Sequence, residues 1–326
     1  MVDVLEPAPT NHQILVNVNV AGLTYLDALI ATGKYQVKFP APFVLGGEFV
    51  GRVESVGDKV AGFAKGDLVV GQTIVGALAE KVVASADQLI PLPAEFDLPI
   101  AATMLQSYAT ALYALTRRVS VREGDTVLVL GAGGGVGLAC IDVAIASGAR
   151  VIAVASSERK RSLATAMGAT ATIDPNLENV KLRVREYSKT GADIVVDPVG
   201  GSVAEPALRA LGSGGRYLVI GFASGTIPSI PINLVLLNNR EMLGVDLGSL
   251  TMNDPGLVKA INIEVVSGVQ GQKYRPTAPE LVGLAQVGPV LRGLVDRGLS
   301  GKFAVDIRGE RVRPETQQTQ LHIPPE

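Results

Sequence analysis

The chain has 326 residues, of which 47% are hydrophobic, and its formal net charge at neutral pH is −2. This length and hydrophobic content are sufficient for two domains with sizeable cores. The 29 lysines and arginines are scattered, whereas nucleic-acid-binding proteins cluster them, which disfavours a nucleic-acid-binding role. The most apolar stretch, residues 127–149, contains a glycine cluster and Asp142, which argues against a membrane-spanning helix.

The counts of cysteine and histidine restrict the chemistry further. Cys140 is the single cysteine, and His12 and His322 are the two histidines. An intrachain disulfide is excluded, and a zinc site made of the usual Cys and His ligands is nearly so. A single cysteine suits a reducing compartment, and no signal-peptide pattern is visible, so we expect a cytoplasmic protein. Cys140 itself is expected to be a small buried hydrophobe.

Residues 1–100 alternate short apolar runs with glycine, aspartate and proline, a pattern typical of short strands joined by turns. The clearest strand is ILVNVNVAG, residues 14–22, in which apolar and polar residues alternate from Val16 to Val20. Further strands are predicted over residues 48–57, 67–75 and 77–85. This region is therefore interpreted as a compact, mostly antiparallel β-domain.

Beyond Pro99 the pattern changes, and a helix is predicted over residues 101–118. Strands and helices then alternate, which predicts βαβ units and a parallel sheet. The predicted strands cover residues 126–131, 150–155, 171–173, 194–197, 216–221 and 242–245, and the predicted helices cover 135–147 and 158–167.

The last part of the chain is predicted to return to the first domain. A helix starts near Asp254 and Pro255, a second helix covers residues 287–298, and KFAVDI, residues 302–307, forms a strand. We assign residues 1–105 and 248–307 to the β-domain, 106–247 to the parallel-sheet domain, and the polar, proline-rich residues 308–326 to a mobile tail.

The sequence GAGGGVG, residues 131–137, follows an apolar strand and opens a helix. Glycines at such a strand-to-helix turn let the backbone approach a pyrophosphate, which the helix N-terminus then binds. The register is Ala132-x-Gly134-x-x-Gly137, with Gly135 and Val136 at the start of the helix, and alanine stands where the usual fingerprint has its first glycine. We interpret the loop as a dinucleotide-binding site; the alternative is a turn that serves only helix–strand packing.

The next strand ends in AVASSERKR, with Ser156 where NAD-binding proteins place an acid for the ribose 2′-hydroxyl. Ser157, Lys160 and Arg161 add hydrogen-bond donors and positive charge, which suit a 2′-phosphate. Glu158 is expected to lie in the first helical turn, where acids are common. The pattern favours NADPH as cofactor, and the alternative is an ordinary solvated helix start.

These segments resemble the medium-chain dehydrogenase/reductase superfamily, and within it the zinc-free quinone oxidoreductase group that includes zeta-crystallin. The resemblance covers residues 2–307 and rests on PFVLGGEFVGRVESVGDKVAGFAKGDLVV from Pro42, on ATALYAL from Ala109, and on DPVGG and GFASG. In zinc-dependent relatives a metal-binding histidine precedes the glutamate that is Glu48 here, whereas this chain has Gly47. The resemblance implies a Rossmann cofactor domain with a GroES-like catalytic domain, and no metal.

The resemblance also implies roles for individual residues. Thr110 and the segment Gly221, Phe222 and Ala223 would lie around the nicotinamide half of the cofactor, and Thr24 would lie at the cofactor as well. Tyr35, in GKYQVKFP, matches a tyrosine that donates a proton or hydrogen bond in related enoyl reductases. A role for Tyr35 in packing the cleft wall is the alternative, and Tyr25 is expected to serve packing. Asp197 is interpreted as structural or adjacent to the cofactor.

Three departures from the family pattern stand out. Relatives commonly have some two dozen further residues before a segment like VDVLEPAP, so the chain resembles a form that lacks the opening strands. Thr24 replaces the usual asparagine. Pro175 replaces a tyrosine that often helps to hold the 2′-phosphate.

We expect a zinc-independent NADPH-dependent reductase of quinones or other conjugated carbonyl compounds. The alternatives are a 2-enoyl-thioester or haloacrylate-type reductase of the same fold, and a catalytically weak, crystallin-like NADPH-binding protein. A homodimer joined along the edge strand near residues 242–245 is also expected.

Overall fold

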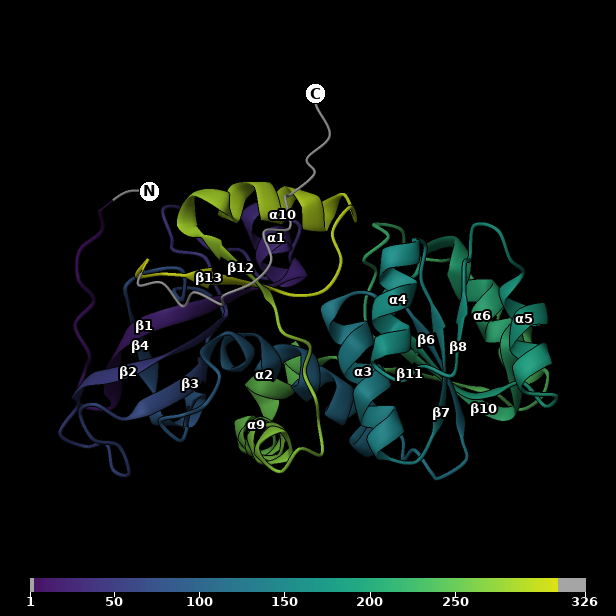
Figure 1. The fold of residues 1–326 in the computed structure, drawn as a ribbon, viewed down its shortest axis with the longest axis horizontal. Coiled ribbons are helices and arrows are strands. Elements are labelled where there is room, and N and C mark those ends of the chain that lie inside the picture. The colour runs from purple at the N-terminus through teal and green to yellow at the C-terminus, as the bar shows by residue number, and fades with distance from the viewer. Residues whose placement is uncertain (1–2, 310–326) are drawn as a thin grey trace.

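The computed structural model describes residues 3–309 and contains two β-sheets at opposite ends of the molecule (Figure 1). Helices α2 (Leu98–Leu112) and α9 (Pro255–Gln270) lie between them. Of the predicted tail, residues 310–326 lie outside the described residues. The predicted fold class, a parallel Rossmann-like sheet with a mostly antiparallel GroES-like sheet, is confirmed.

The antiparallel lobe consists of a seven-stranded sheet with α1 (Tyr25–Ala31) and α10 (Val287–Val295). The strand order is β12-β13-β1-β2-β3-β5, and β4 also pairs with β1. All neighbours are antiparallel except β12 and β13. The strands are β1 (Gln13–Leu23), β2 (Glu48–Val56), β3 (Leu68–Gln72), β4 (Lys81–Ser85), β5 (Leu89–Pro91), β12 (Glu280–Gly283) and β13 (Phe303–Asp306).

The alternation predicted for residues 14–22 holds only in the middle of β1, from Val16 to Val20, because residues 14–16 and 20–23 are buried without interruption. Two predicted strands are shorter than expected, because residues 73–80 form a turn in which Gly76 has a φ of +111°. Helix α1 was not predicted. Its start is marked by a capping box in which Thr24 and Asp27 bond each other's backbone, a signal that the sequence contains.

The parallel lobe consists of a six-stranded sheet in the order β11-β10-β9-β6-β7-β8, with α3 to α6 packed on it. Every neighbouring pair is parallel. The chain runs from β6 outward to β8, then returns to β9 and continues outward on the other side. The strand order therefore reverses between β6 and β9, and ligands of such sheets bind at the carboxyl ends of the strands around this reversal.

The elements of this lobe are β6 (Thr126–Leu130), α3 (Gly135–Ala146), β7 (Arg150–Val154), α4 (Glu158–Ala166), β8 (Ala171–Ile173), α5 (Val180–Tyr187), β9 (Ala192–Asp197), α6 (Ala204–Ala210), β10 (Leu211–Val219), α7 (Asn233–Leu236) and β11 (Glu241–Gly244). Helix α8 (Leu247–Asn253) follows β11, and three short 3₁₀ turns cover Ala86–Gln88, Gly201–Val203 and Leu284–Gln286.

Helix α2 joins the two lobes. Asp97 caps it by accepting the N–H of Ile100 at 2.9 Å, and the helix continues as a wider turn over Tyr113–Arg118. It packs on β1 and β2 on one side and on α3 on the other, and most of its side chains are buried. The domain boundary expected at residue 105 thus falls inside a helix that belongs to both cores.

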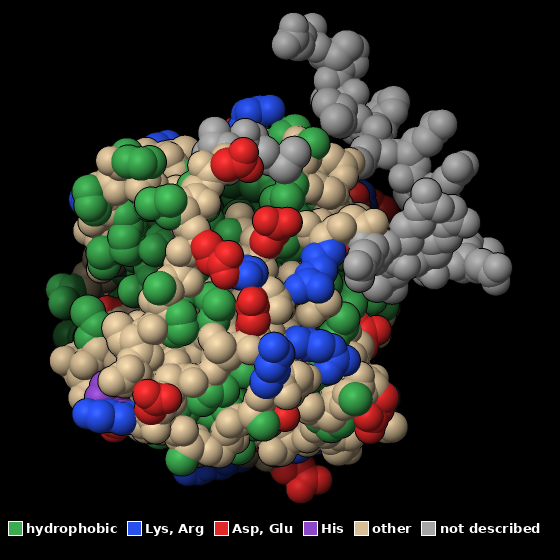
Figure 2. Space-filling view, turned by 90° about the vertical axis from the view of Figure 1, so that its left-hand side faces the viewer, with side chains coloured by type: hydrophobic (Ala, Val, Ile, Leu, Met, Phe, Trp, Pro, Cys, Tyr) green, Lys and Arg blue, Asp and Glu red, His purple; other side chains and the backbone are tan. Residues whose placement is uncertain are grey.

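The outer face of the antiparallel lobe carries acidic and basic side chains interspersed with apolar ones (Figure 2). Lys81 on β4, for example, pairs with Glu54 at 3.0 Å and with Glu6 at 2.5 Å. Over residues 3–309, none of the helices combines the length and the apolar character that a membrane crossing needs.

Candidate active site

The predicted glycine loop connects β6 to α3. Gly131 has a φ of +61°, and Gly134 is the N-cap of α3. A Cβ atom on Gly137 would lie 2.3 Å from the carbonyl oxygen of Gly131, so only glycine allows this close approach of helix and strand. Gly134 forms an isolated parallel bridge with Gly301, which directs the N–H of Gly135 toward the carbonyl of Gly301. In the described part of the chain, no backbone carbonyl accepts the N–H groups of Val136 and Gly137. These donors and the helix dipole suit an anion, so the loop fits a dinucleotide diphosphate.

The strand end expected to discriminate between the cofactors lies next to this loop, at the end of β7. Ser156 is exposed, whereas the Oγ of Ser157 accepts the N–H of Lys160 at 3.4 Å as the N-cap of α4. Arg161 donates to Asp174 at 2.7 Å and to Glu158 at 3.0 Å. The charge of Arg161 is therefore balanced by acids, and Ser156 and Lys160 remain available for a phosphate.

A residue of the other lobe contacts this strand end through its backbone. The Nζ of Lys160 donates to the carbonyl oxygen of Arg297 at 2.7 Å, and Arg297 has a φ of +59° just after α10. Burial, together with the nearby Arg297 charge, lowers the pKa of Lys160. Among residues 3–309 neither side chain forms an ion pair. Two adjacent cations without a carboxylate indicate a place for an anion, and the sequence analysis did not identify Arg297.

The opposite side of the glycine loop faces the loops after β9 and β10. Asp197 accepts the N–H groups of Val199 and Gly200, each at 2.8 Å, and the hydroxyl of Tyr217 at 2.5 Å. Its carboxylate is buried and fixes the shape of residues 197–200. Asp197 therefore has the structural role that the sequence left open.

The predicted segment Gly221–Ala223 packs on this fixed loop. Ala223 donates its N–H to the carbonyl of Pro198 at 3.1 Å, and Gly200 lies so close to the ring of Phe222 that a Cβ would be 2.8 Å from it. Val199 in turn contacts Gly131. The structure therefore brings Gly221, Phe222 and Ala223 together with the glycine loop along one edge of the sheet.

The two predicted threonines make local hydrogen bonds. The hydroxyl of Thr110 donates to the carbonyl of Gln106 at 2.8 Å within α2. The hydroxyl of Thr24 donates to the Asp27 carboxylate at 2.7 Å, at the start of α1. Both hydroxyls are thus engaged in their own helices in this structure, and a contact of either with a cofactor stays a prediction.

Tyr35 lies in the loop after α1 and is half-buried. Its hydroxyl is 3.3 Å from the point where a Cβ on Gly248 would stand, in the first turn of α8. Burial and the nearby Asp246, which caps α8, raise the pKa of Tyr35, so its phenol stays protonated at neutral pH. Because α8 follows β11, Tyr35 lies at the same sheet edge as Gly221, on the side away from Ser156.

Gly47 leaves this region without the histidine of zinc-dependent relatives. A Cβ there would lie 3.3 Å from the carbonyl of Thr73 and 4.0 Å from a carboxylate oxygen of Asp27. Over the described residues, no three side chains among His, Cys, Asp and Glu are grouped so that they could hold a metal ion.

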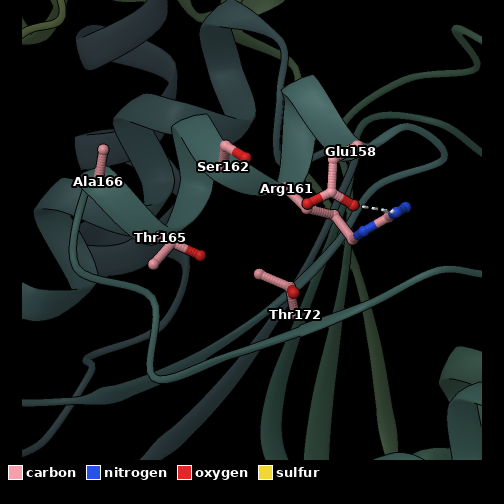
Figure 3. Close-up of a pocket in the computed structure, with 6 residues that line it drawn as sticks. All are labelled: Glu158, Arg161, Ser162, Thr165, Ala166 and Thr172. Carbon is pink, nitrogen blue, oxygen red and sulfur yellow. Dashed lines mark hydrogen bonds and ion pairs between the residues drawn. The ribbon is translucent and has the colours of Figure 1, made fainter.

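A shallow depression on the parallel lobe adjoins the end of β7, with which it shares Glu158 and Arg161 (Figure 3). It has a volume of about 420 Å³ and lies between α4 and β8, lined by Glu158, Arg161, Ser162, Thr165, Ala166 and Thr172. The Arg161–Glu158 ion pair closes one side of it. No open backbone donors or unpaired cations converge there, so we place the candidate site along the strand ends instead.

Comparison with known proteins agrees with this geometry. Residues 10–94 match the alcohol dehydrogenase GroES-like domain family, and residues 135–262 match the family described as zinc-binding dehydrogenase. A quinone oxidoreductase-like protein 2 homolog from Nematostella vectensis is 35% identical over 300 residues, covering 91% of this chain and 82% of that protein. The chain belongs to the quinone-oxidoreductase-like group of the medium-chain dehydrogenase/reductase superfamily.

Two solved structures share the fold over almost the whole chain. A mycobacterial protein solved in complex with NADPH has a TM-score of 0.85 and 28% identity, covering 93% of this chain and 94% of that one. A structure described as an NAD-dependent alcohol dehydrogenase also has a TM-score of 0.85, with 30% identity and 94% coverage of both chains. Solved structures of this fold are therefore described with either NADPH or NAD as the cofactor.

Proposed function

We propose that this protein is a zinc-independent, NADPH-dependent reductase of quinones or other conjugated carbonyl compounds. The observation that carries the proposal is the end of β7 beside the glycine loop. Ser156 ends this strand without an acid, Lys160 lies in the first turn of α4 with its Nζ on the carbonyl of Arg297, and the N–H donors of Val136 and Gly137 are close by in sequence. A carboxylate at this position would bind a ribose 2′-hydroxyl and repel a phosphate.

Different residues would bind the different parts of the cofactor and the substrate. The N–H groups of Val136 and Gly137 would hold the diphosphate, and the segment Gly221–Ala223 would flank the nicotinamide. When bound, the reduced nicotinamide supplies a hydride to the substrate. The phenol of Tyr35 would donate a hydrogen bond or proton to the oxygen on which negative charge develops. A preorganised donor is needed there, because residues 3–309 contain no group of side chains that could hold a metal ion to stabilise that charge.

The proposal is tested first by measuring cofactor binding and then by measuring turnover. Dissociation constants for NADPH and NADH are measured by the change in intrinsic or cofactor fluorescence, and we expect NADPH to bind more tightly. Consumption of NADPH is then followed with a panel of quinones, enones and enoyl thioesters. Preference for NADH overturns the cofactor assignment. Tight NADPH binding without turnover of any member of the panel overturns the reductase assignment and favours a cofactor-binding protein.

We also propose that the protein forms a homodimer along β11, the outer strand of the parallel sheet. An exposed sheet edge favours pairing with a second copy. Large apolar side chains are exposed on β11 and on the segment before it, namely Ile227, Ile232, Leu236, Leu237 and Met242. Light scattering at micromolar concentration should give twice the mass of the chain, and Met242→Asp should yield the monomer. A monomeric wild-type protein would rule the proposal out.

A further inference from the structure

A buried lysine lies beside the start of α3, and a buried acid interacts with it electrostatically. Lys302 comes just before β13, at the far end of the described chain, and Glu48 begins β2. Glu48 is 0% exposed and Lys302 is 7% exposed. Charged side chains are rarely so deeply buried unless they are paired or have a function, yet the function described so far uses neither of them.

The side chain of Lys302 reaches into the start of α3. Its Cε lies 3.7 Å from the point where a Cβ on Gly135 would stand, and its Nζ donates to the carbonyl of Thr103 at 2.8 Å. The next residue back, Gly301, donates its N–H to the carbonyl of Gly133 at 2.9 Å. The ammonium group is thus fixed beside the first helical turn whose N–H donors are open.

Only one of the two carboxylate oxygens of Glu48 has a hydrogen-bond partner. One carboxylate oxygen accepts the N–H of Gln106 at 2.9 Å, while Oε2 has no hydrogen-bond partner. No ion pair within 4 Å joins Glu48 to Lys302, although each affects the other electrostatically. An unpartnered buried carboxylate oxygen costs about 1–3 kcal/mol or more, and binding a proton removes much of that cost.

Burial opposes the charge of both groups. It raises the pKa of Glu48 to about 8 and lowers the pKa of Lys302 to about 8. The other charged or titratable groups that face them are Asp27 beside Glu48, Asp142 beside Lys302, and Tyr108, whose ring Lys302 contacts. Asp142 accepts from Tyr108 and from the N–H of Arg275, each at 2.6 Å. The pair therefore gains protons, and with them positive charge, as the pH falls through this range.

We propose that Lys302 and Glu48 form a proton-binding site coupled to the anion site at the start of α3, so that binding of the cofactor diphosphate takes up a proton from solvent. The inference rests on the proposed function, because it needs a dinucleotide at the glycine loop. The added positive charge attracts the diphosphate, and by reciprocity the bound diphosphate favours the protonated pair. The proton is held on the Lys302 amine or on the Glu48 carboxylate, and no bond in the cofactor changes.

The primary measurement is proton uptake near pH 8 on mixing the protein with NADPH in weakly buffered solution containing an indicator dye. We expect uptake in the wild type and a Kd that rises about three- to tenfold between about pH 7 and about pH 9.5. NADH should give the same uptake, because it shares the diphosphate but lacks the 2′-phosphate. High salt should reduce the effect little, because buried charges are weakly screened.

Two variants should move the midpoint of uptake in opposite directions. Glu48→Gln removes the charge that raises the pKa of Lys302, so uptake shifts to lower pH. Lys302→Met removes the charge that lowers the pKa of Glu48, so uptake shifts to higher pH. The double variant should show no uptake, and Lys59→Met, at an exposed lysine, should behave as wild type. A merely structural role would not produce opposite shifts.

The outcomes separate this inference from the proposed function. If the wild type binds neither NADPH nor NADH, both fail together. If it binds either nucleotide without taking up a proton near pH 8, only the coupling is wrong. If the midpoint of proton uptake is unchanged in Glu48→Gln, the coupling is also wrong. Because Gln is nearly isosteric with Glu, this variant can be used for the test even if Lys302→Met fails to fold.

Discussion

The two ends of the candidate site are built in different ways. At the adenosine end, the glycine loop, Ser156 and Lys160 come from one continuous stretch of about thirty residues. The backbone geometry of this stretch determines much of the adenosine end. At the nicotinamide end, Tyr35, Asp246 and Phe222 come from separate segments that only the tertiary fold brings to one sheet edge. The comparison shows why a short motif reveals a cofactor more readily than a substrate.

The largest expected effect tests the nicotinamide end. Tyr35→Phe removes one hydroxyl and keeps the ring, and loss of a preorganised donor typically costs about 2.7–4 kcal/mol, or about a hundred- to thousandfold in turnover. The assay should use an enone or enoyl thioester, because quinones accept hydride readily and water can protonate the product. NADPH affinity should be unchanged, which distinguishes lost chemistry from lost binding.

Packing alone makes a different prediction for the same variant. Phenylalanine fills nearly the volume of tyrosine. If Tyr35 only packs the cleft wall, the substitution should therefore lower the rate only a few-fold. Tyr25→Phe is the matched control, since Tyr25 lies in the first turn of α1 and is assigned to packing. A Tyr35→Phe enzyme that reduces the enone at nearly the wild-type rate would leave Tyr35 without a catalytic role.

The next effect tests the adenosine end. Ser156→Asp places an anion where the 2′-phosphate would bind, and losing one charge-assisted contact costs about 1.5–3 kcal/mol, roughly ten- to a hundredfold in NADPH affinity. NADH affinity should stay the same or improve. Ser162→Asp adds the same charge on the exposed outer side of α4 and should leave the preference for NADPH intact. Equal losses in both variants would mean that the charge acts at long range.

A smaller effect tests whether the adenosine end extends into the other lobe. Arg297→Gly removes the guanidinium while supplying the residue that a φ of +59° favours, so the fold should be kept or slightly stabilised. We expect NADPH affinity to fall about tenfold and NADH affinity to change little. A fall of equal size for both nucleotides would show that Arg297 acts on the shared part of the cofactor or on lobe closure.

The features that could be predicted from the sequence are the local ones, as at the adenosine end of the site. The strands, the parallel sheet and the glycine loop were predicted because apolar runs and glycine positions are local signals. Arg297 and Lys302 were missed as site residues, because each lies in an ordinary-looking segment. The proposed role of Arg297 depends on its contact with Lys160 on the other lobe, and that of Lys302 depends on its contact with Gly135. Arg161 was grouped with the phosphate-binding cations, since its partner Asp174 is adjacent only in the fold.

The last prediction is that removal of metal ions has no effect on the protein. Dialysis against a strong chelator should leave both turnover and NADPH affinity unchanged, because the residues around Gly47 do not supply a ligand set. A zinc ion needs about four ligands, mostly Cys and His. The nearest groups here are the carbonyls of Thr73 and Ile74 and then Asp27, whose other oxygen already accepts from Thr24. Reintroducing one ligand with Gly47→His should not create a zinc dependence, since the remaining positions are still missing. A wild-type activity that the chelator removes and added zinc restores would contradict this reading of Gly47. It would also remove the reason for assigning the developing charge to Tyr35, because a metal ion would then stabilise it.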